Sequence, residues 1–188
     1  MARHLRPLAA VLFALVGLLA LGSSAALAAE ATEARLPNLH RELSARGLSF
    51  LERHEGFVGH LYNDSAGNCT IGYGHLLHHG GCGPGDRARY PHGISRSQAR
   101  ELLRRDAAVA ERSVRHHVRV PLNQHQFDAL VSFTFNVGTH AFESSTLLRV
   151  LNQRHYDQVP AQLMRWTIGG LEQRRADEVR LWRDGRYS

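Results

Sequence analysis

The sequence predicts an α+β fold, in which one helix leads into a small β-hairpin region and a larger helical lobe follows, with a cleft between the two parts. Residues 60–73 combine strand-forming side chains with a turn-rich cluster. From residue 95 onward, apolar side chains recur at helical spacing between capping signals. With 188 residues, of which 43% are hydrophobic, the chain is long enough for one domain with a buried core.

The first 28 residues are expected to form a secretory signal peptide. Arg3 and Arg6 give a positive start, residues 8–21 form an apolar run, and residues 26–28 match a small-residue cleavage site. An uncleaved signal-anchor is the alternative, because weakly apolar sequence continues past this site. Cleavage near Ala28 predicts an exported protein, periplasmic or extracellular, that meets a membrane only through this segment.

Residues 29–43 are polar and contain a proline, and we expect a linker there ahead of a single folded domain over residues 44–188. Ser44 is expected to cap a helix that Gly56 ends, which places Glu55 in the last turn. A carboxyl group in that position faces the negative end of the helix dipole. Its ionised form is therefore disfavoured, and its proton is held more tightly.

The β region is expected to be a hairpin over residues 61–73, or a three-stranded sheet if residues 74–77 add a strand. The turn at residues 65–68 would bring Asp64 close to Thr70, so that both face one cleft. The following segment, residues 78–93, is rich in glycine and proline and is expected to be a loop.

The helical lobe is predicted from two capping boxes, Ser95 with Gln98 and Asn123 with Gln126. The helix after the second box is apolar on nearly all sides, as for a helix buried in the core, and Gly138 ends it. Further helices are expected over residues 145–153, 159–166 and 171–182.

Cys69 and Cys82 are the two cysteines of the chain, and an oxidising compartment would allow them to form one disulfide. A metal site is the alternative, because His75, His78 and His79 are close to Cys82 in sequence. Their spacing matches no zinc motif, so neither a metal nor another cofactor is expected.

Residues 55–75 read E-G-x₅-Y-x-D-x₂-G-x₂-T-x-G-Y-G-H. This pattern resembles the phage-type lysozymes and endolysins, a family of glycoside hydrolases. Segments further along agree in order: residues 126–130, 135–138, 145–148 and Arg174-Arg175 with Glu178. The resemblance implies a lysozyme-like fold and hydrolysis of the β-1,4 bond between N-acetylmuramic acid and N-acetylglucosamine in bacterial peptidoglycan.

Glycoside hydrolysis needs one protonated carboxyl group and one ionised carboxylate. Glu55 suits the general acid because of its place at a helix end, and Asp64 suits the ionised partner because its hairpin is open to water. The hydroxyl of Thr70 can hold the attacking water. The resemblance assigns the same three roles and implies inversion, whereas sequence spacing alone does not distinguish inverting from retaining enzymes.

Five further positions are expected to support this site. Tyr62 and Tyr73 are candidates to stack on sugar rings, with burial in the core as the alternative. His75 is expected to be structural and hydrogen-bonded. Either Arg174 or Arg175 is expected to pair with the proposed acid, as the resemblance implies, and the alternative for each is an exposed surface position.

The formal net charge of +6 suits an anionic partner, and the chain has no dense arginine tract with interleaved aromatic residues, so nucleic acid is not expected. The expected partner is the glycan strand of peptidoglycan, and a monomer is expected. A lytic transglycosylase that needs Glu55 alone and a non-catalytic peptidoglycan-binding module are the alternatives. Retention of Asp64 and Thr70 favours the hydrolase over both, while a phage or bacterial role stays open.

Overall fold

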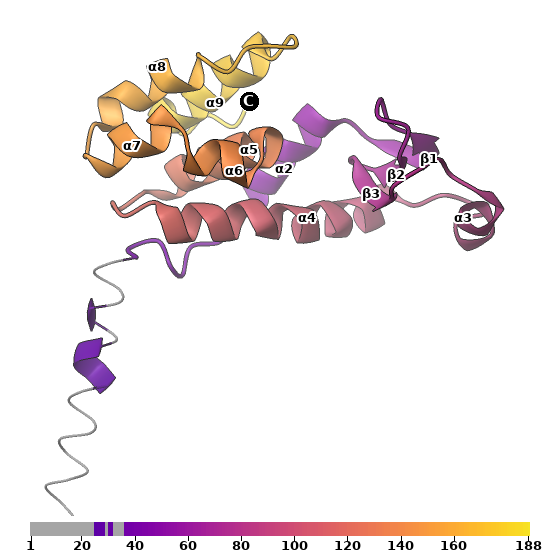
Figure 1. Ribbon diagram of the computed structural model, residues 1–188, viewed down its shortest axis with the longest axis horizontal. Helices are drawn as coiled ribbons and strands as arrows, with labels where there is room; N and C mark the ends of the chain where they lie inside the picture. The colour runs from indigo at the N-terminus through magenta and orange to yellow at the C-terminus, as the bar shows by residue number, and fades with distance from the viewer. Residues whose placement is uncertain (1–24, 29, 32–35) are drawn as a thin grey trace, which may run out of the picture. The chain divides into compact units, whose positions relative to one another are not determined.

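The computed structural model describes residues 25–28, 30–31 and 36–188 (Figure 1). The chain divides into two compact units, Met1–Leu36 and Pro37–Ser188. Residues 25–28 are helical and exposed, and the rest of the expected signal peptide lies outside the described residues. Within the described ranges, no helix has the length and apolar character needed to cross a membrane.

The second unit is an α+β fold, as the sequence predicts. Helix α2 (Ala45–Glu55) leads into an antiparallel sheet in the order β1 (Val58–Asn63), β2 (Cys69–Gly72), β3 (His75–His78). The helices that follow are α3 (Pro84–Arg89), α4 (Arg96–His117), α5 (Gln124–Val137), α6 (Thr139–Glu143), α7 (Thr146–Asn152), α8 (Val159–Leu163) and α9 (Glu172–Asp184), with a short 3₁₀ helix η1 (Tyr156–Gln158) before α8.

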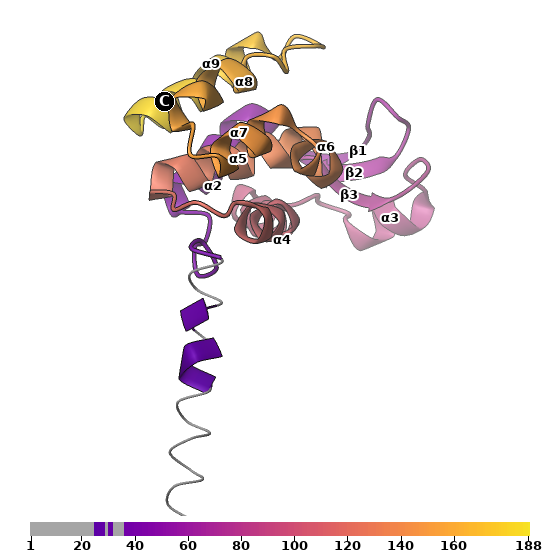
Figure 2. The same ribbon diagram turned by 60° about the vertical axis from the view of Figure 1, so that its left-hand side comes forward.

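The long helix α4 joins the two parts of this unit. It packs against α5 at the helical lobe and against β2 and β3 at the sheet. Figures 1 and 2 show it running from one part to the other, with α3 beside the sheet at the end away from α7, α8 and α9. A single rigid element thus fixes the spacing between the sheet and the helical lobe.

Helix α5 is the centre of the helical lobe and is buried along most of its length, as its apolar sequence predicts. Its buried side chains are Phe127, Asp128, Ala129, Leu130, Val131, Ser132, Phe133 and Thr134. Helices α2, α4, α6 and α9 pack around it. Burial of apolar side chains on this scale is the main source of stability in a domain of this size.

The capping signals define the helix starts where the sequence places them. Ser44 accepts a hydrogen bond from the Gly47 amide, and the boxes at Ser95 and Asn123 are both complete. At the other end of α2, Gly56 adopts φ +70°, a conformation that favours glycine and that turns the chain from the helix into β1.

Several elements differ from the sequence expectation, and β1 begins at Val58, ahead of the expected start at residue 61. The third strand is present but begins at His75, so that it starts one residue later than expected. The segment expected to be only a loop contains α3, whose Pro84 stands at the first helical position and whose Asp86 accepts a hydrogen bond from the Gly83 amide. Helix α8 ends at Leu163, three residues early.

The compact unit also begins earlier than expected, at Pro37 rather than at Ser44. Asn38 is fully buried, and its side-chain amide donates to the carbonyls of Val118 (3.2 Å) and Val120 (2.9 Å) and accepts from the Leu122 amide (3.1 Å). The end of the expected linker is therefore part of the fold, because it satisfies the backbone of the irregular α4–α5 connection.

Replacing Asn38 with alanine is expected to lower the free energy of unfolding by about 2–3 kcal/mol, because it leaves buried backbone groups at the α4–α5 connection without partners. Urea denaturation of the variant measures this loss. Glu42→Ala, an exposed substitution in the same segment, is the matched control and should change stability little. Equal stability of the two variants would contradict a structural role for Asn38.

Candidate active site

Glu55 is the last residue of α2, and a guanidinium from α9 holds its carboxylate. Nη1 of Arg174 donates to Oε1 of Glu55 at 2.7 Å. The Glu55 side chain is 21% exposed and that of Arg174 is 7% exposed, so the pair is accessible from the Glu55 side only. Of the two arginines considered for this contact, Arg174 makes it.

Arg174 is itself fixed by a buried network. Its Nε donates to Oε1 of Glu178 (3.3 Å) and its Nη2 donates to the Ser132 carbonyl (3.2 Å). Arg175 is fully buried and donates to Glu178, to the side-chain oxygen of Asn136 and to the Trp166 carbonyl. Arg175 is therefore neither a partner of Glu55 nor a surface residue, because it neutralises Glu178 inside the helical lobe.

Two opposing electrostatic influences act on Glu55, of which the sequence indicates only one. The carboxyl group of Glu55 lies at the negative end of the α2 dipole, as expected. The guanidinium of Arg174 brings a positive charge within hydrogen-bond distance of the same group. The sequence analysis considered the first effect alone, because the contact joins residues 119 positions apart.

Asp64 lies just after β1, at the start of the hairpin turn, where the turn itself holds its carboxylate. Oδ1 accepts from the backbone amides of Ala66 (2.9 Å) and Asn68 (2.8 Å), and Oδ2 lies 3.4 Å from the side-chain nitrogen of Asn68. The Asn68 backbone amide is the largest cause that lowers the pKa of Asp64 below its ordinary value, and the Asn68 side chain adds to it. The turn therefore keeps Asp64 ionised at neutral pH.

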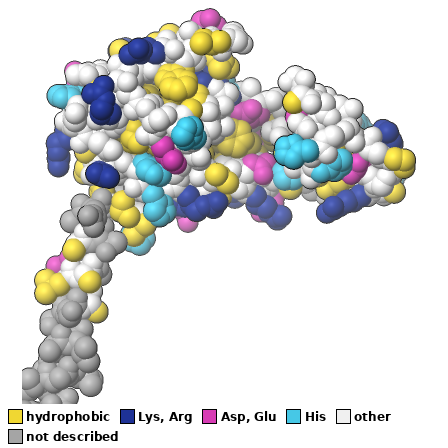
Figure 3. Space-filling model, in the orientation of Figure 1, with side chains coloured by type: hydrophobic (Ala, Val, Ile, Leu, Met, Phe, Trp, Pro, Cys, Tyr) yellow, Lys and Arg dark blue, Asp and Glu magenta, His cyan; other side chains and the backbone are white. Residues whose placement is uncertain are grey.

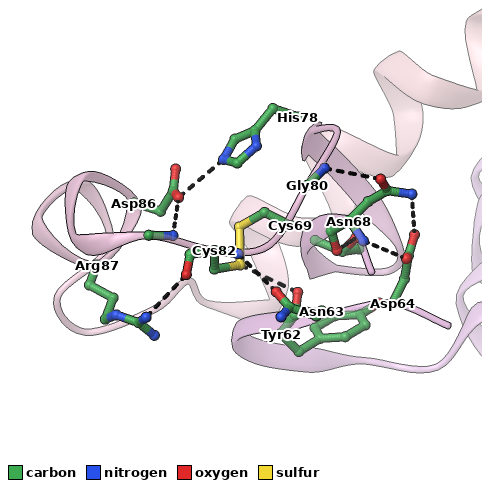
Figure 4. The surroundings of a disulfide bond; sticks show 12 residues. Tyr62, Asn63, Asp64, Asn68, Cys69, His78, Gly80, Cys82, Asp86 and Arg87 are labelled. Atoms are coloured by element: carbon green, nitrogen blue, oxygen red, sulfur yellow. Dashed lines mark hydrogen bonds and ion pairs between the residues drawn. A yellow bond between two sulfur atoms is a disulfide. The ribbon is translucent and has the colours of Figure 1, made fainter. Parts of the chain in front are cut away.

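Asn68 links this carboxylate to the disulfide (Figure 4). Cys69 and Cys82 are bonded, as the sequence predicts, which ties the segment after β3 to β2. The Gly80 amide in that segment donates to Oδ1 of Asn68 at 3.2 Å. Because its oxygen is engaged there, the amide of Asn68 presents its nitrogen to Asp64.

Thr70 and Tyr62 face each other across β1 and β2, as paired residues of the two strands. The hydroxyl of Thr70 donates to the Asn68 carbonyl at 3.1 Å, so its oxygen is left to accept a hydrogen bond. Burial raises the pKa of Tyr62, and the charges of Asp64 and Glu55 raise it further. Both carboxylates therefore act on the same phenol, which places them on one region of the surface.

Tyr73 is held by packing and His75 by a polar contact. Tyr73 is buried, with its ring 5.5 Å from that of Phe57, which corresponds to the core alternative for this residue. Nδ1 of His75 lies 2.9 Å from Oδ2 of Asp106 on α4, and this contact ties β3 to the long helix. His75 thus has the hydrogen-bonded surroundings that the sequence analysis expects.

The residues considered for a metal are divided among other partners. Cys82 is in the disulfide, His75 pairs with Asp106, and Nε2 of His78 lies 3.1 Å from Oδ2 of Asp86. Nδ1 of His79 lies 3.4 Å from Oδ1 of Asn68, so each of the four residues considered has a partner of its own.

His54 is the site residue that the sequence analysis missed. It precedes Glu55, stacks edge-on against Phe50 (4.6 Å between ring centres) and lies 3.6 Å from Asp177. Burial lowers its pKa to about 4, and the nearby Arg174 adds to that effect. The sequence could have predicted this partial burial, because His54 follows Phe50 by four residues and therefore lies on the same face of α2.

The surface between the helical lobe and the sheet is hollowed in the space-filling view, with acidic side chains in the hollow (Figure 3). A mixed fold of this kind, with one carboxylate at a helix end and another on a three-stranded hairpin sheet, defines a glycosidase of the lysozyme type.

The chain belongs to the phage lysozyme family, which matches residues 52–178. The endolysin of Salmonella phage P22 is 38% identical over 131 residues, which cover 70% of this chain and 87% of that protein. Among solved structures, the endolysin from Escherichia coli O157:H7 phage FAHEc1 superposes with a TM-score of 0.70 at 30% identity, covering 79% of this chain and 98% of that one.

The muramidase domain of SpmX from Asticaccaulis excentricus is a further structural neighbour, with a TM-score of 0.66 at 30% identity; the match covers 77% of this chain and 99% of that domain. The family resemblance and the lysozyme-like fold expected from the sequence are both confirmed. The protein is accordingly a peptidoglycan-lysing lysozyme.

His54 is expected to make the fold lose stability as the pH falls from about 6.5 to about 4. In that range the unfolded chain takes up a proton at His54 whereas the folded chain does not, so protonation favours unfolding. His54→Gln removes the titrating group. Over the same pH range the free energy of unfolding of this variant should decrease less than that of the wild type, by on the order of 2 kcal/mol.

Urea denaturation at several pH values measures this difference. His116→Gln, which replaces an exposed histidine on α4, is the control and should keep the wild-type slope. A His54→Gln variant with the wild-type slope would show that His54 titrates alike in the folded and unfolded chain.

Proposed function

We propose that this chain is an exported muramidase that hydrolyses the β-1,4 bond between N-acetylmuramic acid and N-acetylglucosamine in peptidoglycan. The observation that carries the proposal is the pairing of two carboxylates in opposite settings. Glu55 is half-buried at a helix end, and Asp64 is ionised by the amides of its own turn. Two carboxyl groups with different protonation states are what glycoside hydrolysis requires.

In this reaction Glu55 gives its proton to the glycosidic oxygen, and the bond to the anomeric carbon breaks. Arg174 then stabilises the carboxylate that proton transfer leaves behind, since it lies 2.7 Å from Oε1. The charge pair thus works in the direction of the reaction, because the positive charge lies where the negative charge develops.

The second substrate is a water molecule that attacks the anomeric carbon. Asp64 takes one of its protons, and the other stays on the water oxygen and donates a hydrogen bond to the Thr70 hydroxyl. Attack from the side opposite the leaving group inverts the anomeric centre. Tyr62, whose pKa is raised by the charges of both carboxylates as well as by burial, is the proposed aromatic contact for a sugar ring.

The signal-like sequence of residues 1–28 supports export, with cleavage near Ala28. The disulfide at the active-site hairpin supports an oxidising destination. The proposed partners are the glycan strands of peptidoglycan, reached by a monomer that contacts a membrane only through its first residues. The relatives named as endolysins and as a muramidase domain support this assignment.

Mass spectrometry of muropeptides tests the proposal. Purified peptidoglycan digested with the full chain should yield fragments with ordinary reducing ends, because water takes up the broken bond. Glu55→Gln and Asp64→Asn should each lower the rate by about 10²- to 10⁴-fold. Glu101→Gln, which replaces an exposed glutamate on α4, is the matched control and should cleave at the wild-type rate.

Two outcomes would contradict the proposal. Fragments with anhydro ends would mean that the substrate closes on itself, as in a lytic transglycosylase that needs Glu55 alone. Cleavage of peptidoglycan by Glu55→Gln at the wild-type rate would show that Glu55 is not the general acid.

A further inference from the structure

The disulfide lies among side chains that are common ligands of metal ions. The sulfur of Cys69, a ring nitrogen of His78 and a carboxylate oxygen of Asp86 all lie within 4.8 Å of one another. Cys82 is bonded to Cys69, so its sulfur adjoins this group without being one of the three mutually close ligand atoms. Figure 4 shows His78 and Asp86 beside the disulfide, away from Asp64.

The surroundings of His78 and Asp86 are those of metal ligands. Nδ1 of His78 donates to the His79 carbonyl at 3.0 Å and Nε2 donates to Oδ2 of Asp86 at 3.1 Å, so a metal ion bound between Nε2 and this carboxylate would take the place of the Nε2 proton. A metal-bound histidine ordinarily donates its second ring N–H to a carbonyl or a carboxylate in this way. The Gly83 amide likewise donates to Asp86 at 2.8 Å and orients its carboxylate.

We propose that the reduced chain binds a zinc ion at this place, with Cys69, Cys82, His78 and Asp86 as ligands. Two thiolates, an imidazole and a carboxylate are a donor set that suits Zn²⁺, which takes four ligands in a tetrahedron. In such a site the ligand atoms lie roughly 3–4 Å apart, so the atoms of Cys69, His78 and Asp86 are already near that spacing, and the Cys82 sulfur must move toward them once the disulfide opens.

The chemistry balances with a dithiol as reductant. The dithiol transfers two electrons and two protons to the Cys69–Cys82 bond, which becomes two thiols, and the reductant becomes a disulfide. Zn²⁺ then forms two bonds to sulfur and one to Nε2 of His78, and the two thiol protons and the Nε2 proton are released to solvent. The disulfide and the zinc site are therefore alternative states of the same residues, set by the redox environment.

The zinc ion would hold the segment after β3 to β2, as the disulfide does. Cys69 is in β2, His78 is in β3, Cys82 is in the segment after it and Asp86 is in α3. One ion bound by all four keeps that segment against the hairpin whose turn holds Asp64. This inference does not depend on the proposed reaction, because it concerns the fold around the disulfide.

Titration of the reduced full chain with Co²⁺, a spectroscopic substitute for Zn²⁺, tests the inference. A phosphine reductant opens the disulfide and becomes a phosphine oxide, and it competes weakly for the metal. We expect one Co²⁺ per chain, with a thiolate-to-cobalt absorption band that added Zn²⁺ abolishes. The oxidised chain should show no such band.

Four variants identify the ligands. His78→Ala and Asp86→Asn should each weaken Co²⁺ binding by more than about tenfold, and Asp86→Asn still accepts from the Gly83 amide. Cys69→Ser combined with Cys82→Ser should abolish the band. His140→Ala, an exposed histidine on α6, is the matched control and should bind as the wild type does.

The outcomes decide the inference in either direction. A reduced chain without the band, folded or unfolded by circular dichroism, would overturn it. Wild-type affinity in both His78→Ala and Asp86→Asn would also overturn it, because two thiolates alone would then bind the ion. A reduced chain that folds only on adding metal, with the same dependence on these residues, would support it.

Discussion

The arrangement of the active site depends on one buried set of charges. Arg175 and Glu178 of α9 are fully buried, and such charges are tolerated only when they are paired and hydrogen-bonded. The carboxylate of Glu178 accepts hydrogen bonds from Arg174, Arg175 and the Ser132 hydroxyl of α5. Arg174 also donates to Glu55 on α2. Helices α2, α5 and α9 are therefore held together by groups that cannot separate without leaving a buried charge unpaired. Among the charged groups of this network, Glu55 is the one that is partly exposed to solvent.

The two carboxylates are held by different physical means. Packing of helices fixes Glu55, whereas Asp64 owes its position to short-range hydrogen bonds within its own turn. Asn68 connects that turn to the segment closed by the disulfide, and His75 connects the sheet to α4. The sheet contributes little apolar core of its own, so the covalent link and these polar contacts replace the burial that stabilises the helical lobe.

Local signals in the sequence predicted the parts of the fold that depend on neighbouring residues. Ser44 caps α2 through a bond to a residue three positions on, and the disulfide follows from there being one cysteine pair. Contacts between distant residues could not be predicted from local patterns. Asn38 binds a segment about 80 positions away, and both arginines of α9 are buried, so that only the contact with Glu55, 119 positions away, distinguishes Arg174 from Arg175. Helix α3 was missed because six residues give too little periodicity for a pattern.

The account places the attacking water on Asp64 and Thr70, across the sugar from Glu55. The anomeric configuration of the first product tests this most directly, because it records the face that water attacks. Proton NMR of freshly cleaved peptidoglycan glycan fragments, recorded before mutarotation, measures it. The account predicts that the new reducing end appears first as the α anomer. A β anomer would contradict it, since Asp64 would then act as a nucleophile that forms a covalent intermediate.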